Sequence, residues 1–238
     1  IREQTIQTTP DGPETIGELP DALVPIQAMY HQQADDFESA LKSWNILTTK
    51  FPELSAYQLE VALLYTSVKD FETASILFEK LLRDFPDDVN VWKQYAGFLM
   101  SQADESGSQE AYQRALALLL DQEPEGFWPH LQWQMDVGSM YFSMGDLEMA
   151  EKALLKLTLQ VPYYFPPYNV LGFLYLELKD YYKAEIAFKQ ALELQPQNPY
   201  LHQSLTTTFM GNRAPGQSRY WEEQSVPKMY GFKDLIPT

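Results

Sequence analysis

The side chains able to do acid–base or metal chemistry are histidines and carboxylates, and their spacing argues against both uses. His31, His130 and His202 lie far apart in the sequence, and none has a second histidine at i+3 or i+4 that could bind the same metal from one helix face. Acidic pairs such as Asp35-Asp36 fall at turns and helix starts, where carboxylates favour the positive end of a helix. We therefore expect no metal site and no catalytic carboxylate pair.

The sequence also lacks the motifs that place nucleophiles or cradle phosphates. It contains no cysteine, which excludes disulfides, thiolate metal ligands and cysteine nucleophiles. No Walker loop and no G-x-G-x-x-G, G-x-S-x-G or H-E-x-x-H pattern occurs. These absences predict a protein that is not an enzyme and that uses no cofactor.

Composition limits the class of partner. The chain has 238 residues, 45 % of them apolar, and a net charge of −16. Residues 1–20 carry −3 and residues 212–238 carry +1, so residues 21–211 carry −14. This acidity argues against nucleic acid and against binding to an anionic membrane by charge. No apolar run approaches the ~20 residues that a membrane-spanning helix needs.

Residues 167–196 contain two helical patterns separated by a turn at Lys179-Asp180. In each pattern, side chains recur at the i, i+3, i+4 and i+7 spacing of one helix face or close to it. They are Tyr168, Leu171, Gly172 and Tyr175 in the first, and Ala184, Phe188, Ala191 and Leu192 in the second. The small residues within these stripes allow close approach of the two helices, and Pro196 ends the second.

This arrangement resembles the tetratricopeptide repeat, a 34-residue helix–turn–helix unit. Pro196 lies 34 residues after Pro162, and Pro86 lies 34 residues after Pro52. The resemblance implies an all-α fold, a right-handed superhelical solenoid of about five repeats with a C-terminal capping helix. The expected repeats are 21–54, 55–88, 89–122, 131–164 and 165–198, followed by a capping helix at 199–211.

Three segments fall outside this register. Residues 123–130 are an insertion after the middle repeat, and it carries Phe127 and Trp128. We expect these aromatics either to fill a locally altered helix stack, the reading we favour, or to form a secondary contact surface. Residues 1–20 read as an extended polar arm. Residues 212–238 are too rich in aromatic residues for a free tail, so we expect them to pack on the solenoid or on a partner.

The resemblance also implies where a partner binds, because first helices of this family line a concave groove. Transferring the family's groove positions to this sequence gives Leu59, Leu63, Asn90, Lys93, Met100, Met135, Phe142, Asn169, Phe173 and Leu176. The set is mainly apolar or neutral, with Lys93 as its one basic residue. We expect the groove to hold an apolar or amphipathic protein segment, although part of the set could instead pack between adjacent first helices.

The function that follows is a non-enzymatic interaction scaffold or assembly factor with a protein or peptide partner, within a larger complex. Two alternatives stay open. Surface aromatics could bind a glycan, or one of the terminal segments, 1–20 or 212–238, could fill the groove of its own or a neighbouring molecule, which would allow a homo-oligomer. We expect the periplasm or envelope of a bacterium as the location, because the chain is cysteine-free and begins with a polar, leader-like arm; the cytoplasm is the alternative.

Overall fold

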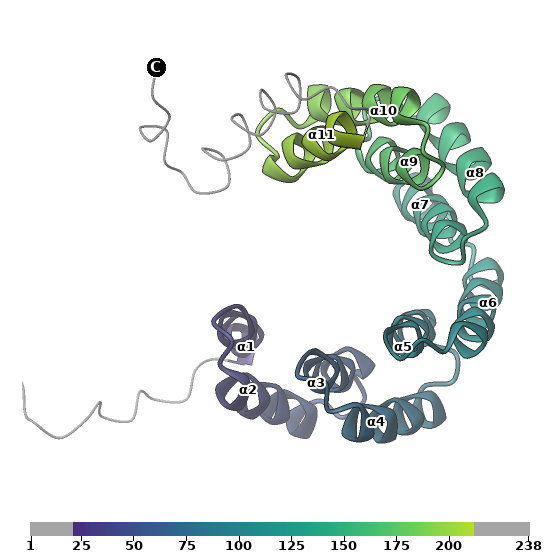
Figure 1. Ribbon diagram of the computed structural model, residues 1–238. Coiled ribbons are helices and arrows are strands. Elements are labelled where there is room, and N and C mark those ends of the chain that lie inside the picture. Colours follow the sequence, from purple (N-terminus) through teal and green to yellow (C-terminus); the bar gives the residue numbers. More distant parts are fainter. Residues whose placement is uncertain (1–20, 212–238) are drawn as a thin grey trace, which may run out of the picture. The chain divides into compact units, whose positions relative to one another are not determined.

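The computed structural model describes residues 21–211, and these residues form helices joined by short turns (Figure 1). The expectations for the arm 1–20 and the tail 212–238 lie outside the described residues. Contacts divide the chain into two compact units between Ala103 and Asp104. We describe each unit separately.

The first unit consists of two helical hairpins and one further helix. In Figure 1 the first helices of its repeats form one layer and the second helices form the other. A short 3-10 helix, Asp21–Leu23, precedes α1 Val24–Gln33 and α2 Phe37–Lys50, then α3 Ser55–Ser67 and α4 Phe71–Asp84, and finally α5 Val89–Ser101.

The second unit begins with the second helix of the middle repeat and continues through two hairpins to a single last helix. Its helices are α6 Glu105–Asp121, α7 Phe127–Ser143, α8 Leu147–Gln160, α9 Pro166–Glu177, α10 Tyr181–Leu194 and α11 Pro199–Gly211. Between residues 21 and 211 there is no strand. The predicted all-α fold of repeated helix–turn–helix units with a final single helix is confirmed.

The insertion differs from the expected loop. Residues 122–126 connect α6 to α7, but Phe127 already begins α7, so the second half of 123–130 adds a turn to a first helix. Gly126 makes the change of direction with a positive φ of 94°, a backbone conformation that glycine adopts without steric cost. Phe127 and Trp128 are 63 % and 70 % exposed, so the favoured reading, in which they fill a gap in the helix stack, is wrong.

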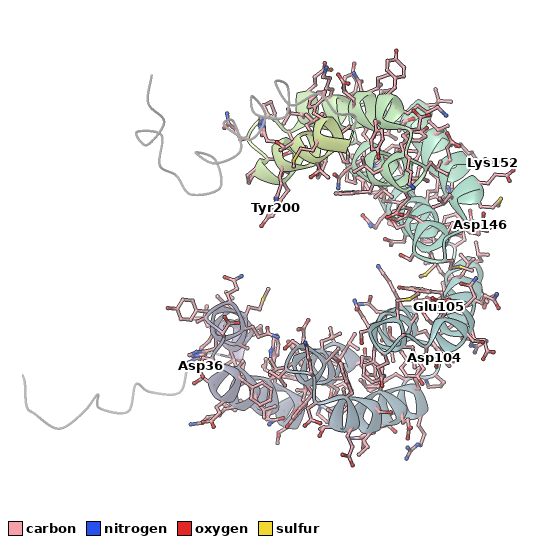
Figure 2. The ribbon with its side chains drawn as sticks, in the orientation of Figure 1. Asp36, Asp104, Glu105, Asp146, Lys152 and Tyr200 are labelled. Atoms are coloured by element: carbon pink, nitrogen blue, oxygen red, sulfur yellow. The ribbon has the colours of Figure 1, made fainter. Side chains whose placement is uncertain are left out.

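An aspartate begins every second helix. Its side chain accepts a hydrogen bond from the backbone N–H three residues later, which satisfies one of the free donors of the first turn. The caps are Asp36, Asp70, Asp104, Asp146 and Asp180; Figure 2 labels three of them. They recur every 34 residues except across the insertion, and the residue before each has a positive φ. The same turn is thus repeated five times.

A second side-chain interaction recurs at the turn between repeats. A side chain in the first turn of a first helix bonds to the carbonyl oxygen of a proline six residues earlier. The pairs are Gln58 to Pro52, Trp92 to Pro86, Tyr168 to Pro162 and His202 to Pro196. Because a carbonyl only accepts, the His202 ring donates from Nε2. The insertion interrupts the series: Gln134, at the corresponding position, contacts His130 instead.

The cores follow the apolar stripes predicted for each repeat. In the first unit, one cluster centres on Trp44 and Leu47 and another on Phe78 and Leu81. In the second unit, a single cluster runs from α7 to α11 around Phe188. Each repeat therefore depends on its neighbours to bury its apolar surface, as in other repeat proteins.

Close packing of the fifth repeat depends on Gly172. A Cβ at this position would lie 2.4 Å from the ring of Phe188, which is fully buried. Gly97 is also in a first helix, but a Cβ there would meet nothing within 4 Å.

We expect opposite effects of the same substitution at these two glycines. Gly172→Ala should lower the free energy of unfolding by about 1–3 kcal/mol through overpacking. Gly97→Ala should leave it unchanged or raise it by up to ~1 kcal/mol, because alanine favours helix. Urea unfolding followed by circular dichroism measures both, and equal effects would contradict the role given to Gly172.

Candidate protein-interaction surface

The predicted partner-binding residues all lie on first helices, but their side chains differ in exposure. Leu59 and Met135 are 5 % and 6 % exposed and belong to the cores around Phe78 and Phe188. A side chain buried to this degree cannot present a contact area to a partner. We therefore assign both residues to the core and leave them out of the candidate surface.

The remaining residues are at least partly accessible. Those in the first unit, which we call the first-unit face, are Leu63, Asn90, Lys93 and Met100. Leu63 is half-buried against the core around Phe78, whereas Met100 is 49 % exposed. Helices α3 and α5, which carry these residues, contact each other. The first-unit face thus combines two apolar side chains with an amide and one ammonium group.

The second-unit face consists of Phe142, Asn169, Phe173 and Leu176. It lies on α7 and α9, which contact each other. Phe142 and Leu176 are half-buried and pack on the core. Phe173 is 41 % exposed and stands edge-on to Phe188, with 5.1 Å between ring centroids. A ring held from below by a rigid core and open above is a suitable anchor for a partner's apolar side chain.

In the second unit, side-chain hydrogen bonds also connect α7 with the turn before α9. Gln132 Nε2 donates to Asp136 Oδ1 at 3.0 Å, and the Tyr164 hydroxyl donates to Gln132 Oε1 at 3.3 Å. Burial, with a smaller contribution from the negative charge of Asp136, raises the pKa of Tyr164. Tyr164 therefore stays neutral at physiological pH and links the turn before α9 to α7.

A polar bond also joins first helices in the first unit. The Glu60 carboxyl is half-buried and hydrogen-bonded to the Gln32 side chain, between α3 and α1. Burial raises the pKa of Glu60 above its ordinary value, and the bond to Gln32 offsets only part of this effect. The charged form of Glu60 is therefore disfavoured in the folded protein.

The raised pKa of Glu60 predicts that the stability of the fold decreases as the pH rises. Because the folded protein holds this proton more tightly than the unfolded chain, Glu60 destabilises the fold increasingly as pH rises above about 4.5. We expect Glu60→Gln to raise the urea midpoint at pH 7, and to have a smaller effect near pH 4, where the carboxyl is largely protonated in both states. A larger stabilisation at pH 4 than at pH 7 would contradict this assignment.

A different cluster in the second unit surrounds Tyr175. Its hydroxyl donates to Glu151 Oε1 at 2.8 Å, and Lys183 Nζ lies 3.6 Å from the same oxygen and 5.0 Å from the tyrosine ring centroid. Burial, followed by the bond to Glu151 and its charge, raises the pKa of Tyr175. The phenol is therefore a permanent hydrogen-bond donor, and the cluster joins α8, α9 and α10.

The histidines have structural partners. His31 Nδ1 lies 3.3 Å from the helix cap Asp36, and His130 Nδ1 lies 3.4 Å from Glu123 while its ring stacks on Trp133. His202 binds the inter-repeat turn described above. In residues 21–211, no group of three or more histidine, aspartate and glutamate side chains could hold a metal ion.

Comparison with known proteins identifies the repeat. Residues 166–198, which comprise α9 and α10, match the family model of the tetratricopeptide repeat. Its helices, turn and close approach at Gly172 are those described above. These residues form a tetratricopeptide repeat, and the other hairpins of the described residues repeat its helix–turn–helix pattern.

Solved structures with this repeat fold resemble the chain over most of its length. PilW, a widely conserved type IV pilus biogenesis factor, has a TM-score of 0.57 at 16 % identity, covering 90 % of this chain and 95 % of PilW. The APC/C hetero-tetramer Cut9–Hcn1 has a TM-score of 0.57 at 17 % identity, covering 87 % of this chain and 40 % of that one. At these identities the likeness concerns the fold.

A curated relative is similar in sequence. "Protein RRP5 homolog" of Mus musculus is 24 % identical over 172 residues, which cover 72 % of this chain and 8 % of the mouse protein. This chain thus spans less than a tenth of that relative.

No helix within residues 21–211 is long and apolar enough to cross a bilayer.

Proposed function

We propose that this tetratricopeptide protein is a non-enzymatic scaffold that binds an apolar or amphipathic segment of another protein on its first-helix faces. The fold supports a protein-interaction scaffold. One observation supports the binding of an apolar segment: Phe173 presents an exposed ring that packs edge-on against the buried ring of Phe188. The second-unit face therefore offers a preformed apolar anchor.

The composition of the face favours an apolar ligand over a charged one. Phe142, Phe173 and Leu176 supply accessible apolar area, and Asn169 supplies an amide able to bond a peptide backbone. The chain's charge of −16 disfavours acidic partners. A helix with large apolar residues at i, i+3, i+4 and i+7 would place several of them on such a surface.

A peptide selection tests the proposal. The full chain is immobilised and a display library of random peptides long enough for four helical turns is selected for binding. We expect the enriched peptides to carry large apolar residues at helical spacing and to bind in solution. Enrichment of acidic or polar peptides, or of none, would overturn the proposal.

The exposed pair Phe127 and Trp128 is a candidate for a secondary contact by the same kind of partner. The two rings pack edge to face with centroids 5.1 Å apart at the start of α7. Exposed, mutually supported aromatics of this kind are common at contact surfaces. Trp128→Ala should weaken a partner that reaches the start of α7 and leave short peptides on the second-unit face unaffected.

We propose a location in a bacterial envelope for this scaffold, with the absence of cysteine as its support. Fractionation of the native source, with the chain detected in each fraction, tests this placement. Recovery in the cytoplasmic fraction alone would overturn it without affecting the proposed binding function.

A further inference from the structure

The last described helix, α11, is buried on two sides. Leu201 and Leu205 belong to the core of the second unit and are 1 % and 0 % exposed. His202, Thr206 and Phe209, which we call the α11 side, are 3 %, 8 % and 1 % exposed. Thr206 follows Leu205 directly, so its side chain points about 100° further round the helix. A helix that packs on one neighbour buries a single stripe, whereas α11 buries a second one as well.

In the two preceding repeats the equivalent side faces the second helix of the same repeat. Gly138 of α7 and Gly172 of α9 correspond to Thr206 at 34-residue steps. A Cβ at Gly138 would lie 2.8 Å from Leu154 of α8. One at Gly172 would lie 2.4 Å from Phe188 of α10. The described residues contain no second helix after α11, yet Thr206 is buried as both glycines are.

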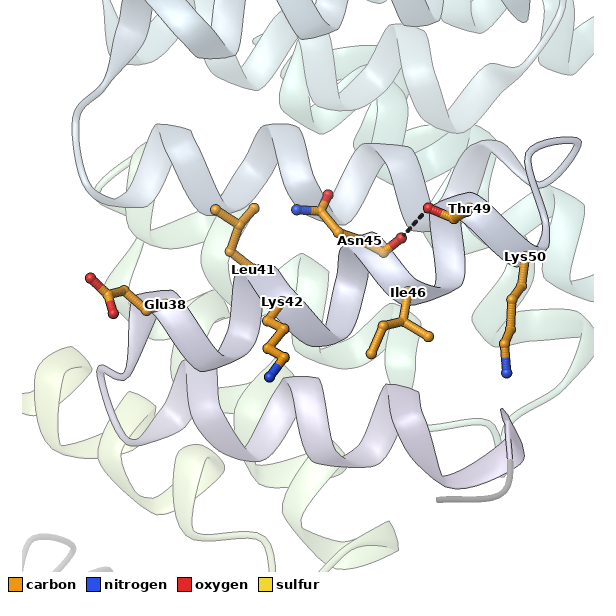
Figure 3. A pocket seen from close by; sticks show the side chains of 7 residues that line it. All are labelled: Glu38, Leu41, Lys42, Asn45, Ile46, Thr49 and Lys50. Atoms are coloured by element: carbon orange, nitrogen blue, oxygen red, sulfur yellow. Dashed lines mark hydrogen bonds between the residues drawn. The ribbon is translucent and has the colours of Figure 1, made fainter. Parts of the chain in front are cut away.

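Helix α2 shows the exposure of a helix side that lies open to solvent. A cavity of about 620 Å³ runs along this helix, and Figure 3 shows the side chains that line it in a row. Leu41 is half-buried, Ile46 is 40 % exposed, and none of the seven lining residues is buried. The α11 side therefore differs from an uncovered helix side.

The chain leaves α11 beside the start of the preceding second helix. A Cβ at Gly211 would lie 2.4 Å from the ring of Tyr181, the first residue of α10. An equivalent contact occurs in the first unit, where Tyr65 near the end of α3 stands edge-on to Phe37, the first residue of α2. There the second helix α4 begins a few residues later. Residues 212–238 continue the chain from the corresponding point.

We propose that residues 212–238 cover the α11 side and close the end of the second unit. The segment follows α11 directly and is longer than the 14 residues of the second helix α10. Ala214 stands where the other repeats have a capping aspartate, so its sequence is not that of a sixth hairpin. Its aromatic side chains suit a buried surface; they are Tyr220, Trp221, Tyr230 and Phe232.

Two polar groups of the α11 side have hydrogen-bond partners within α11 and the turn before it. Thr206 Oγ1 donates to the carbonyl oxygen of His202 at 3.1 Å. His202 Nε2 donates to the carbonyl oxygen of Pro196 at 3.2 Å. An apolar segment therefore covers these groups without leaving them unpaired.

The same helix leaves its other side open. Gln203, Thr207 and Met210 continue the positions of the second-unit face at 34-residue steps. All three are exposed, Met210 at 67 %. A segment that covers the α11 side thus leaves the second-unit face free, and this cover does not depend on the proposed binding function.

Trypsin cleavage of the full chain tests the cover without a partner. Residues 212–238 contain trypsin sites after Arg219 and Lys228. We expect both sites to be cleaved at least tenfold more slowly in the chain than in a synthetic peptide of residues 212–238, as measured by mass spectrometry. Equal rates would overturn the proposal. Protection that disappears on dilution would assign the cover to a second copy of the chain and would overturn it too.

Two adjacent threonines supply a matched pair of variants. Thr206→Glu places a charge within the covered side, whereas Thr207→Glu places the same charge on the exposed side, and neither adds a trypsin site. We expect Thr206→Glu to speed cleavage at Arg219 and Lys228 at least fivefold, and Thr207→Glu to leave it within twofold. Circular dichroism establishes that both variants keep their helices. Equal cleavage rates in the two variants would contradict the cover.

A second measurement leaves α11 unaltered. Its variant carries Tyr220→Asp, Trp221→Asp, Tyr230→Asp and Phe232→Asp, and the reaction of His202 with diethyl pyrocarbonate is followed by mass spectrometry. We expect His202, 3 % exposed, to react at least fivefold faster in the variant, while the half-buried His31 and His130 serve as unchanged references. An unchanged rate at His202 would overturn the proposal. If the variant also bound apolar peptides more tightly, the segment would lie on the second-unit face instead.

Discussion

Phe173→Asp is expected to weaken binding of the selected apolar peptides by about 10- to 100-fold. Burial of a phenylalanine side chain at an interface contributes about 1.5–3 kcal/mol, and an aspartate in its place would lose hydration without gaining a partner. The wild-type ring is 41 % exposed, so the peptide rather than the protein core covers its open area. Isothermal calorimetry or fluorescence anisotropy with one selected peptide measures the change.

The matched control for this substitution is Tyr182→Asp. Tyr182 is an aromatic residue of the same repeat, 73 % exposed on the second helix α10, and it lies outside the proposed face. We expect its substitution to leave peptide affinity within twofold of wild type. Circular dichroism of both variants establishes that the helices are intact, and equal losses in the two variants would remove the second-unit face from the mechanism.

Phe188→Ala is expected to be the most destabilising of the substitutions considered, by about 3–5 kcal/mol. The ring is fully buried, lies against Gly172 and supports Phe173 edge-on. Removing it leaves a cavity between α9 and α10, which neighbouring helices can close only in part. The urea midpoint should fall by more than about 1 M, since small domains have slopes of ~1–3 kcal/mol per molar urea.

Tyr182→Ala provides the comparison for this effect, because it also deletes an aromatic ring from α10 but an exposed one. Its free energy of unfolding should stay within about 0.5 kcal/mol of wild type. A loss at Phe188 no larger than that at Tyr182 would show that the described core is not what stabilises the fifth repeat.

The repeat register could be predicted because it depends on local patterns that recur. Apolar spacing, the prolines at 34-residue intervals and the small residue Gly172 predicted the hairpin that the structure shows between α9 and α10. These features act within one hairpin, where residues close in sequence are also close in space. The fold class therefore followed from these local patterns together with their resemblance to the tetratricopeptide repeat.

The candidate site was predicted less completely, because exposure is a property of the whole stack. Leu59 and Phe173 belong to the same transferred set of groove positions, yet one is buried beside Phe78 and the other is accessible above Phe188. The difference arises from the neighbouring helices, whose side chains are distant in sequence. No spacing rule within a single helix distinguishes the two residues.

The insertion illustrates the same limit. Its aromatic residues suggested a buried plug, but α7 extends back to Phe127 and carries both rings outward. The sequence did contain a helix-start pattern here, because the flexible residue Gly126 comes directly before a segment with a proline near its beginning. The direction of these side chains was decided by packing, since α6 and α7 contact each other while Phe127 and Trp128 in the first turn of α7 stay exposed.

Helical periodicity, acidity and the lack of cysteine could be read from the residues, because periodicity and composition are local and additive. Which first-helix residues are accessible, and that Phe173 packs on Phe188, became known from the folded chain. The physical reason is that burial is set by the adjoining repeats, so each side chain's surroundings depend on helices elsewhere in the stack.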